Sequence, residues 1–148
     1  MSFVYYTVDE RLLPWGEGAE DESVTPETVI AAVERTGGEF ATVAGRSEEL
    51  AAAFEALDEF AGGGGLLPEL AYSGSPGLVL TGRPGHWRLG YFEAALVEHL
   101  HGAFRLQRED VEEALGGLPE AARGLGQAFL EALDDAKSRG LAVAIVHA

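Results

Sequence analysis

The chain has 148 residues, 47% of them hydrophobic and 24% charged, and its 25 acidic and 10 basic side chains give a formal net charge of −15. These values favour one soluble globular domain and argue against collagen, a coiled coil or wholesale disorder. The absence of cysteine excludes a disulfide framework, a thiolate nucleophile and a thiolate metal site. A chain this acidic repels the phosphate backbone of nucleic acids, and we therefore expect no nucleic-acid binding. A basic protein remains a possible partner.

Nothing in the sequence resembles a targeting or membrane segment. Residues 1–8 lack the positively charged start and long apolar core of a signal peptide. The longest apolar stretch, residues 141–146, is far shorter than the roughly 20 residues that span a membrane. We therefore expect a cytoplasmic protein.

The first half of the chain predicts two strands and two helices. Residues 3–8 are β-branched or aromatic on both alternating faces, which indicates a strand covered on two sides. Residues 9–24 predict a solvated acidic loop, and a helix follows with Thr25 as N-cap, Pro26 at its first position and Gly37 as left-handed C-cap. Residues 39–43 predict a short strand, and a second helix begins after Ser47.

The second half begins with four glycines, residues 62–65, which predict a flexible connector within the domain. Residues 78–81 and 86–91 predict a hairpin, and helices are expected over 92–101, 111–118 and 121–136, the last ended by Gly140. Residues 141–148 are apolar on both faces, as in an interior strand. The sequence thus predicts a single α+β domain over residues 1–148, with a mixed sheet, central N- and C-terminal strands and helices packed on it.

Two of the four histidines form a His-x-His pair, His99 and His101. On a helix the two rings lie about 200° apart, which places His99 on the apolar stripe with Phe92 and His101 on the other face with Glu98. We expect one histidine at the edge of the core and one exposed. Glu98 and His101 can hold a metal or form a simple surface pair, and the surface pair is favoured. No cofactor is expected.

The most distinctive window contains Arg83, His86, Trp87, Arg88 and Tyr91. The two arginines and the histidine can bind a carboxylate or phosphate beside the turn, because the guanidinium fork suits planar anions, and the two aromatic residues give apolar support. In the alternative interpretation the arginines pair with the chain's many carboxylates and the tryptophan is buried in the core. His147 is interpreted as a strand-end residue.

The acidity is concentrated in the first half of the chain. Residues 1–82 hold 15 acids and 3 bases, whereas residues 83–148 hold 10 acids and 7 bases. Phosphate-loop, dinucleotide, nucleophile-elbow and zinc-protease motifs are all absent, so we assign no catalytic residue, favour a binding role and leave enzymatic activity open. We expect an interaction module whose acidic half docks a cationic partner. The alternatives are a binding protein or enzyme for a small anionic ligand, at Arg83, His86 and Arg88, and an acidity that reflects genomic composition alone.

Three segments carry a resemblance to a known family: residues 1–8, residues 104–111 and residues 129–146. They resemble the YfbM-like bacterial family, in which an aromatic strand opens the domain, a short acidic helix follows, and a long helix ends in Arg-Gly before a terminal strand. Residues 9–80 depart from the family because they lack an Asp-Lys-x-Trp segment. The family is one of unknown function, so the resemblance implies a fold and no catalytic residues.

Overall fold

The computed structural model describes residues 2–12, 26–73 and 89–148. Its four strands are β1 (Ser2–Val8), β2 (Gly38–Ala44), β3 (Leu89–Phe92) and β4 (Ala142–His147). They form a sheet in the order β2-β1-β4-β3, in which the N- and C-terminal strands are central, as predicted. All three neighbouring pairs are antiparallel, so the prediction of a mixed sheet is wrong.

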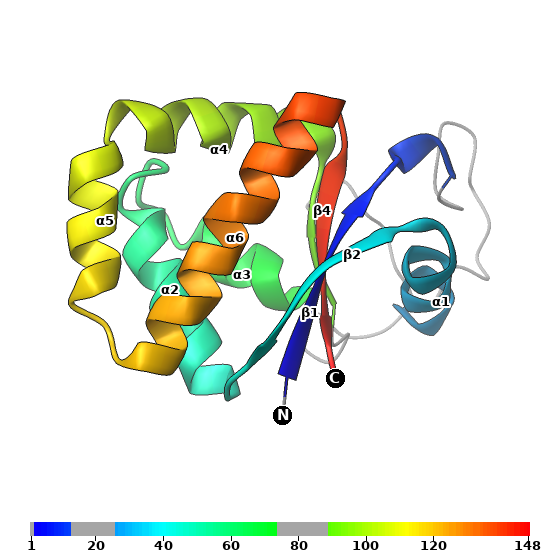
Figure 1. Cartoon of the computed structure of the whole chain (residues 1–148), viewed down its shortest axis with the longest axis horizontal. Helices are drawn as coiled ribbons and strands as arrows, with labels where there is room; N and C mark the ends of the chain where they lie inside the picture. The colour runs from blue at the N-terminus through cyan, green and yellow to red at the C-terminus, as the bar shows by residue number, and fades with distance from the viewer. Residues whose placement is uncertain (1, 13–25, 74–88) are drawn as a thin grey trace.

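Helices cover both faces of this sheet, which confirms the α+β fold (Figure 1). One face carries α1 (Pro26–Thr36), and the other carries α2 (Ser47–Asp58), α3 (Leu66–Ser73), α4 (Ala94–Leu106), α5 (Arg108–Gly116) and α6 (Glu120–Arg139). A short 3-10 helix, η1 (Glu10–Leu12), follows β1. Among the described residues no helix is long and apolar enough to cross a membrane.

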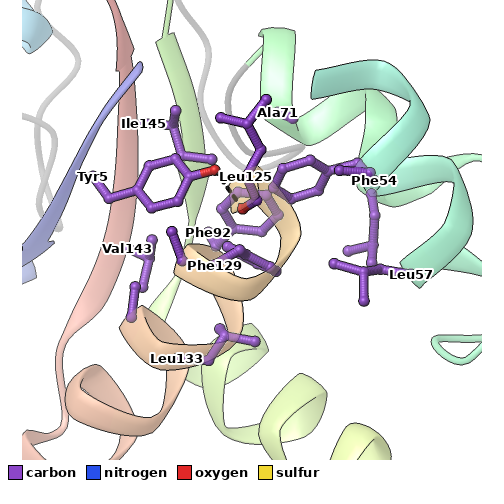
Figure 2. Packing of buried hydrophobic residues seen from close by; sticks show 14 of the residues in the cluster. Tyr5, Phe54, Leu57, Ala71, Phe92, Leu125, Phe129, Leu133, Val143 and Ile145 are labelled. Atoms are coloured by element: carbon purple, nitrogen blue, oxygen red, sulfur yellow. Dashed lines mark hydrogen bonds between the residues drawn. The ribbon is translucent and has the colours of Figure 1, made fainter. Parts of the chain in front are cut away.

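The larger core lies between the sheet and α2–α6 (Figure 2). The ring of Phe129 on α6 packs against Phe54 on α2 and Phe92 on β3, with centroid distances of 4.7 Å in both cases. The buried hydroxyl of Tyr5 donates a 2.7 Å hydrogen bond to the carbonyl of Leu125, which ties β1 to α6. These contacts fix α6 against the centre of the sheet.

Strand β4 alternates as its sequence predicts. Val143 and Ile145 belong to the larger core, whereas Ala142, Ala144 and Val146 belong to a smaller cluster on the α1 face. Both faces of the strand are therefore buried. Gly140 has a φ of 68°, the left-handed conformation predicted for the end of the long helix.

Gly37 is not a left-handed cap, since its φ is not among the positive values in the described chain. Its N–H instead donates a 2.7 Å hydrogen bond to the carbonyl of Val33, and the chain enters β2 directly. A Cβ at this position would lie 2.6 Å from the Val33 oxygen, so close backbone approach accounts for the glycine.

The glycine connector over residues 62–65 joins α2 to α3, a helix that the sequence analysis did not predict. The buried carboxylate of Asp58 accepts hydrogen bonds from the backbone N–H groups of Gly64, Gly65 and Leu67, at 3.1, 2.7 and 3.2 Å. One side chain thus organises the turn and the first residues of α3.

Candidate functional site

Most of the predicted anion site lies outside the described residues. This holds for Arg83, His86, Trp87 and Arg88, and the anion site stays a prediction. Tyr91, its remaining member, is fully buried, and it lies with Leu89 on the α1 face of the sheet. Its hydroxyl donates a 3.0 Å hydrogen bond to a carboxylate oxygen of Glu10.

Glu10 has a structural role at the beginning of α4. Its second carboxylate oxygen accepts a 2.7 Å hydrogen bond from the N–H of Ala94, the first residue of that helix. A carboxylate at a helix N-terminus satisfies an otherwise unpaired donor and interacts favourably with the helix dipole. Glu10, at the described beginning of the acidic loop, thus links η1 to β3 and α4. The neighbouring Asp9 pairs locally with Arg11, and these hydrogen bonds lower the pKa of its carboxyl.

The two neighbouring histidines have the reverse of their predicted environments. His99 is exposed, whereas the side chain of His101 is only 18% exposed and its Nε2 lies 2.8 Å from a carboxylate oxygen of Asp134 on α6. Phe92 belongs to β3 and not to the helix, so it gave the wrong helical phase. The buried face of α4 is set by Val97, Leu100 and Phe104.

The structure does not bring the predicted metal candidates Glu98 and His101 into a wider ligand set. Glu98 is exposed, and His101 pairs with Asp134. In the described ranges no three side chains of histidine, aspartate or glutamate are placed to hold a metal ion. His147, at the end of β4, hydrogen-bonds through Nε2 to the carbonyl of Ala71 at 2.8 Å, and its ring meets Phe3 edge-on.

A first candidate site is the open edge of the sheet. Strand β2 pairs with β1 alone among the described strands, and five of its seven residues are exposed. The pairing register shifts between Tyr5 and Tyr6, which leaves Phe40 as a bulged residue with 36% of its surface exposed. An edge strand offers unpaired backbone N–H and C=O groups to a partner.

Two carboxylates mark this edge as anionic. Tyr6 is paired in register with Glu39 on β2. Burial raises the pKa of the Tyr6 phenol, and the negative charges of Glu34 on α1 and of Glu39 raise it further, so both carboxylates lie near this ring. Glu39 also accepts a 2.8 Å hydrogen bond from the Thr42 hydroxyl. We call β2 with Glu34, Glu39 and Tyr6 the acidic edge.

A second candidate site is a cavity of about 830 Å³ between α4, α5 and α6, which we call the helix groove. Its floor is apolar and its rim is charged. The lining residues are His101, Phe104, Arg105, Arg108, Val111, Glu112, Leu115, Gln127, Leu130, Glu131, Leu133 and Asp134. None of them is a serine, threonine or cysteine, so this lining offers sites for binding and no hydroxyl or thiol nucleophile.

The sequence does not predict the groove, because its residues come from three helices and form no local motif. The one local signal is His101, which the sequence pattern places on a solvent face. The corner between α4 and α5 depends on Gln107, whose amide nitrogen donates to the carbonyls of Phe60 at 3.0 Å and Ala103 at 3.1 Å.

The chain has no match among models of protein families, curated proteins or solved structures. The resemblance to the YfbM-like family therefore stays a prediction.

Proposed function

We propose that the protein is an interaction module that binds an extended basic segment of a protein partner along the acidic edge. The observation that carries the proposal is an exposed edge strand, β2, which contains Glu39 and pairs with β1, where the negative charges of Glu34 and Glu39 both raise the pKa of Tyr6. Main-chain hydrogen bonds to an added strand supply affinity, and side-chain charge selects the partner.

The charge of the surrounding elements supports a cationic partner. Residues 26–69, which include α1, β2, α2 and most of α3, contain nine acids and two bases, a net of −7. Of the two bases, Arg46 lies 3.5 Å from Glu49 and is engaged locally. Helix α2 has no basic residue, and its Glu48 and Glu55 are exposed. The negative electrostatic potential of such a surface speeds association with a positively charged partner. This effect weakens as salt is added.

The proposal includes a cytoplasmic location and a binding role without catalysis. A small anionic ligand at Arg83, His86 and Arg88 remains the alternative function, as predicted from the sequence. The one described member of that site, Tyr91, donates to a carboxylate, so it is not available to an anion in this arrangement.

The test is capture of partners on the immobilised protein from a lysate of its source organism, at about 0.05 M and about 0.5 M salt. We expect a basic protein to be retained at low salt and released at high salt. The double variant Glu34→Gln/Glu39→Gln should lose most of the retained protein, because both substitutions remove charge beside β2.

The matched control is Glu109→Gln/Glu113→Gln, which removes the same charge from exposed positions on α5. It should retain the partner. Equal loss in both double variants would show that net charge alone attracts basic proteins, and no retained partner at either salt concentration would also overturn the proposal.

A further inference from the structure

The helix groove has the size of a small-molecule site. Its volume of about 830 Å³ falls within the roughly 300–1,000 Å³ of ligand pockets. Three helices form its walls, and α5 closes the end where α4 leaves off and α6 begins (Figure 1). All of its lining residues lie between positions 101 and 134, far in sequence from the acidic edge.

The floor of the groove suits an apolar group. Phe104, Val111, Leu115 and Leu133 line it while exposing 5% or less of their surface, and Leu130 is partly buried beside them. A ligand's side chain that lay over this floor and against the partly buried Leu130 would remove its own apolar surface from water.

Charges of both signs line the groove, from α4 and from α6. Helix α4 runs from the sheet toward α5, and α6 runs back to the sheet, so residues on the two helices that face each other follow opposite directions (Figure 1). The 2.8 Å contact between His101 and Asp134 fixes their register. Arg105 lies one helical turn after His101 on α4, and Glu131 lies one turn before Asp134 on α6.

Neither Arg105 nor Glu131 forms an ion pair within the described part of the chain, although both line the groove. The other rim charges are engaged: Arg108 with Glu112 at 3.1 Å, and Asp134 with His101. One cation on α4 and one anion on α6 therefore line the cavity without an ion pair in the described part of the chain.

We propose that the helix groove binds a free α-amino acid with a large apolar side chain. An α-amino acid holds an ammonium and a carboxylate on one carbon, and this arrangement fits between a guanidinium and a carboxylate on facing walls. Arg105 takes the ligand's carboxylate, Glu131 takes its ammonium, and the side chain lies on the floor. The inference is independent of the proposed function, because it uses none of the residues of the acidic edge.

The test is calorimetric titration of the intact protein with L-phenylalanine, with N-acetyl-L-phenylalanine, L-phenylalaninamide and L-alanine as comparators. These lack the ammonium, the carboxylate and the apolar side chain, respectively. We expect saturable binding of L-phenylalanine and at least about tenfold weaker binding of each comparator. One charge-assisted hydrogen bond accounts for about that factor in the two derivatives, and the lost burial of the aromatic ring accounts for it in L-alanine.

Two variants separate the roles of the walls. Arg105→Gln should weaken the binding of L-phenylalanine about tenfold and leave the binding of L-phenylalaninamide unchanged. Glu131→Gln should weaken the binding of L-phenylalanine and leave that of N-acetyl-L-phenylalanine unchanged. The control variants Arg35→Gln and Glu98→Gln, on exposed positions outside the groove, should bind as the parent does. No saturable binding of L-phenylalanine, or an equal loss for all ligands in either wall variant, would overturn the proposal.

Discussion

At the scale of single residues, Asp58 shows how one buried carboxylate specifies a turn and a helix. Asp58 is 7% exposed, and its side chain accepts three backbone hydrogen bonds, two from glycines of the connector and one from Leu67 in α3. Without this acceptor, the N–H of Leu67 has no partner in a buried position. No local pattern predicts these hydrogen bonds, because the acceptor precedes its donors by six to nine residues and lies in the preceding helix.

Asp58→Ala should therefore destabilise the protein by about 2–3 kcal/mol, since it removes charge-assisted hydrogen bonds and leaves a buried donor unsatisfied. Asp58→Asn should cost less, because its amide oxygen still accepts. Urea unfolding measures both. The control Glu59→Ala removes the same charge from an exposed neighbour and should change stability by less than about 0.5 kcal/mol. An equal effect of the two alanine variants would show that Asp58 does not organise the turn.

Tyr5 lowers the stability of the folded protein as the pH becomes alkaline. Burial raises the pKa of its phenol far above the ordinary value of 10.0, so the folded protein keeps the proton where the unfolded chain loses it. The unfolded state is then favoured increasingly as the pH rises above about 10, and the contribution of Tyr5 to stability is full below that pH and declines above it.

In Tyr5→Phe the hydrogen bond to Leu125 is lost, so the variant should be less stable by about 1 kcal/mol near pH 8. The difference in the free energy of unfolding between the parent and Tyr5→Phe should narrow by about 1.4 kcal/mol per pH unit above about pH 10. The parent loses stability there because Tyr5 ionises in its unfolded state, whereas phenylalanine does not ionise. Urea unfolding of both proteins between about pH 8 and pH 11 measures this. Parallel stability curves over the whole range would contradict the account.

At the scale of elements, α6 contains two glycines, Gly124 and Gly126, that differ in how closely neighbouring side chains pack against them. A Cβ at Gly126 would lie 2.6 Å from a methyl carbon of Leu115, so α5 packs directly onto this glycine. A Cβ at Gly124 would meet only Val43, at an ordinary 3.9 Å. Close packing thus offsets the helix-propensity cost of Gly126 and does not explain Gly124.

The two alanine substitutions should consequently have opposite signs. Gly124→Ala should stabilise the protein by about 0.5–1 kcal/mol through helix propensity. Gly126→Ala should destabilise it by about 1–2 kcal/mol, because Leu115 is buried and must move. Thermal and urea unfolding measure both, and stabilisation by Gly126→Ala would show that the contact with α5 relaxes at little cost.

Elements with strong local signals could be predicted, and those set by distant contacts could not. The buried alternation of β4 and the Gly140 cap of α6 are local patterns, and both are confirmed. Helix α3 is only eight residues long and contains Pro68, and the Asp58 carboxylate accepts a hydrogen bond from the N–H of its second residue, Leu67. Its formation therefore depends on tertiary contacts and not on a local sequence pattern. The phase of α4 depends on where β3 ends, and the wrong boundary moved His101 to the wrong face.

At the scale of the whole molecule, the net charge of −15 divides into acids with different roles. Glu10 and Asp58 accept structural hydrogen bonds and Asp9 pairs with Arg11, whereas Glu34 and Glu39 lie at the acidic edge. The concentration of acids before residue 83 could be read from the sequence. Their position beside an open strand could not, because it requires knowing which strand lies at the edge of the sheet.

The most direct test of the acidic edge is amide hydrogen exchange of the protein with and without a short synthetic peptide of alternating lysine and valine. We predict slower exchange in Gly38–Ala44 when the peptide is bound, and loss of most of this protection in Glu34→Gln/Glu39→Gln but not in Glu109→Gln/Glu113→Gln. Unchanged exchange in β2 with protection elsewhere, or equal loss in both double variants, would contradict the account.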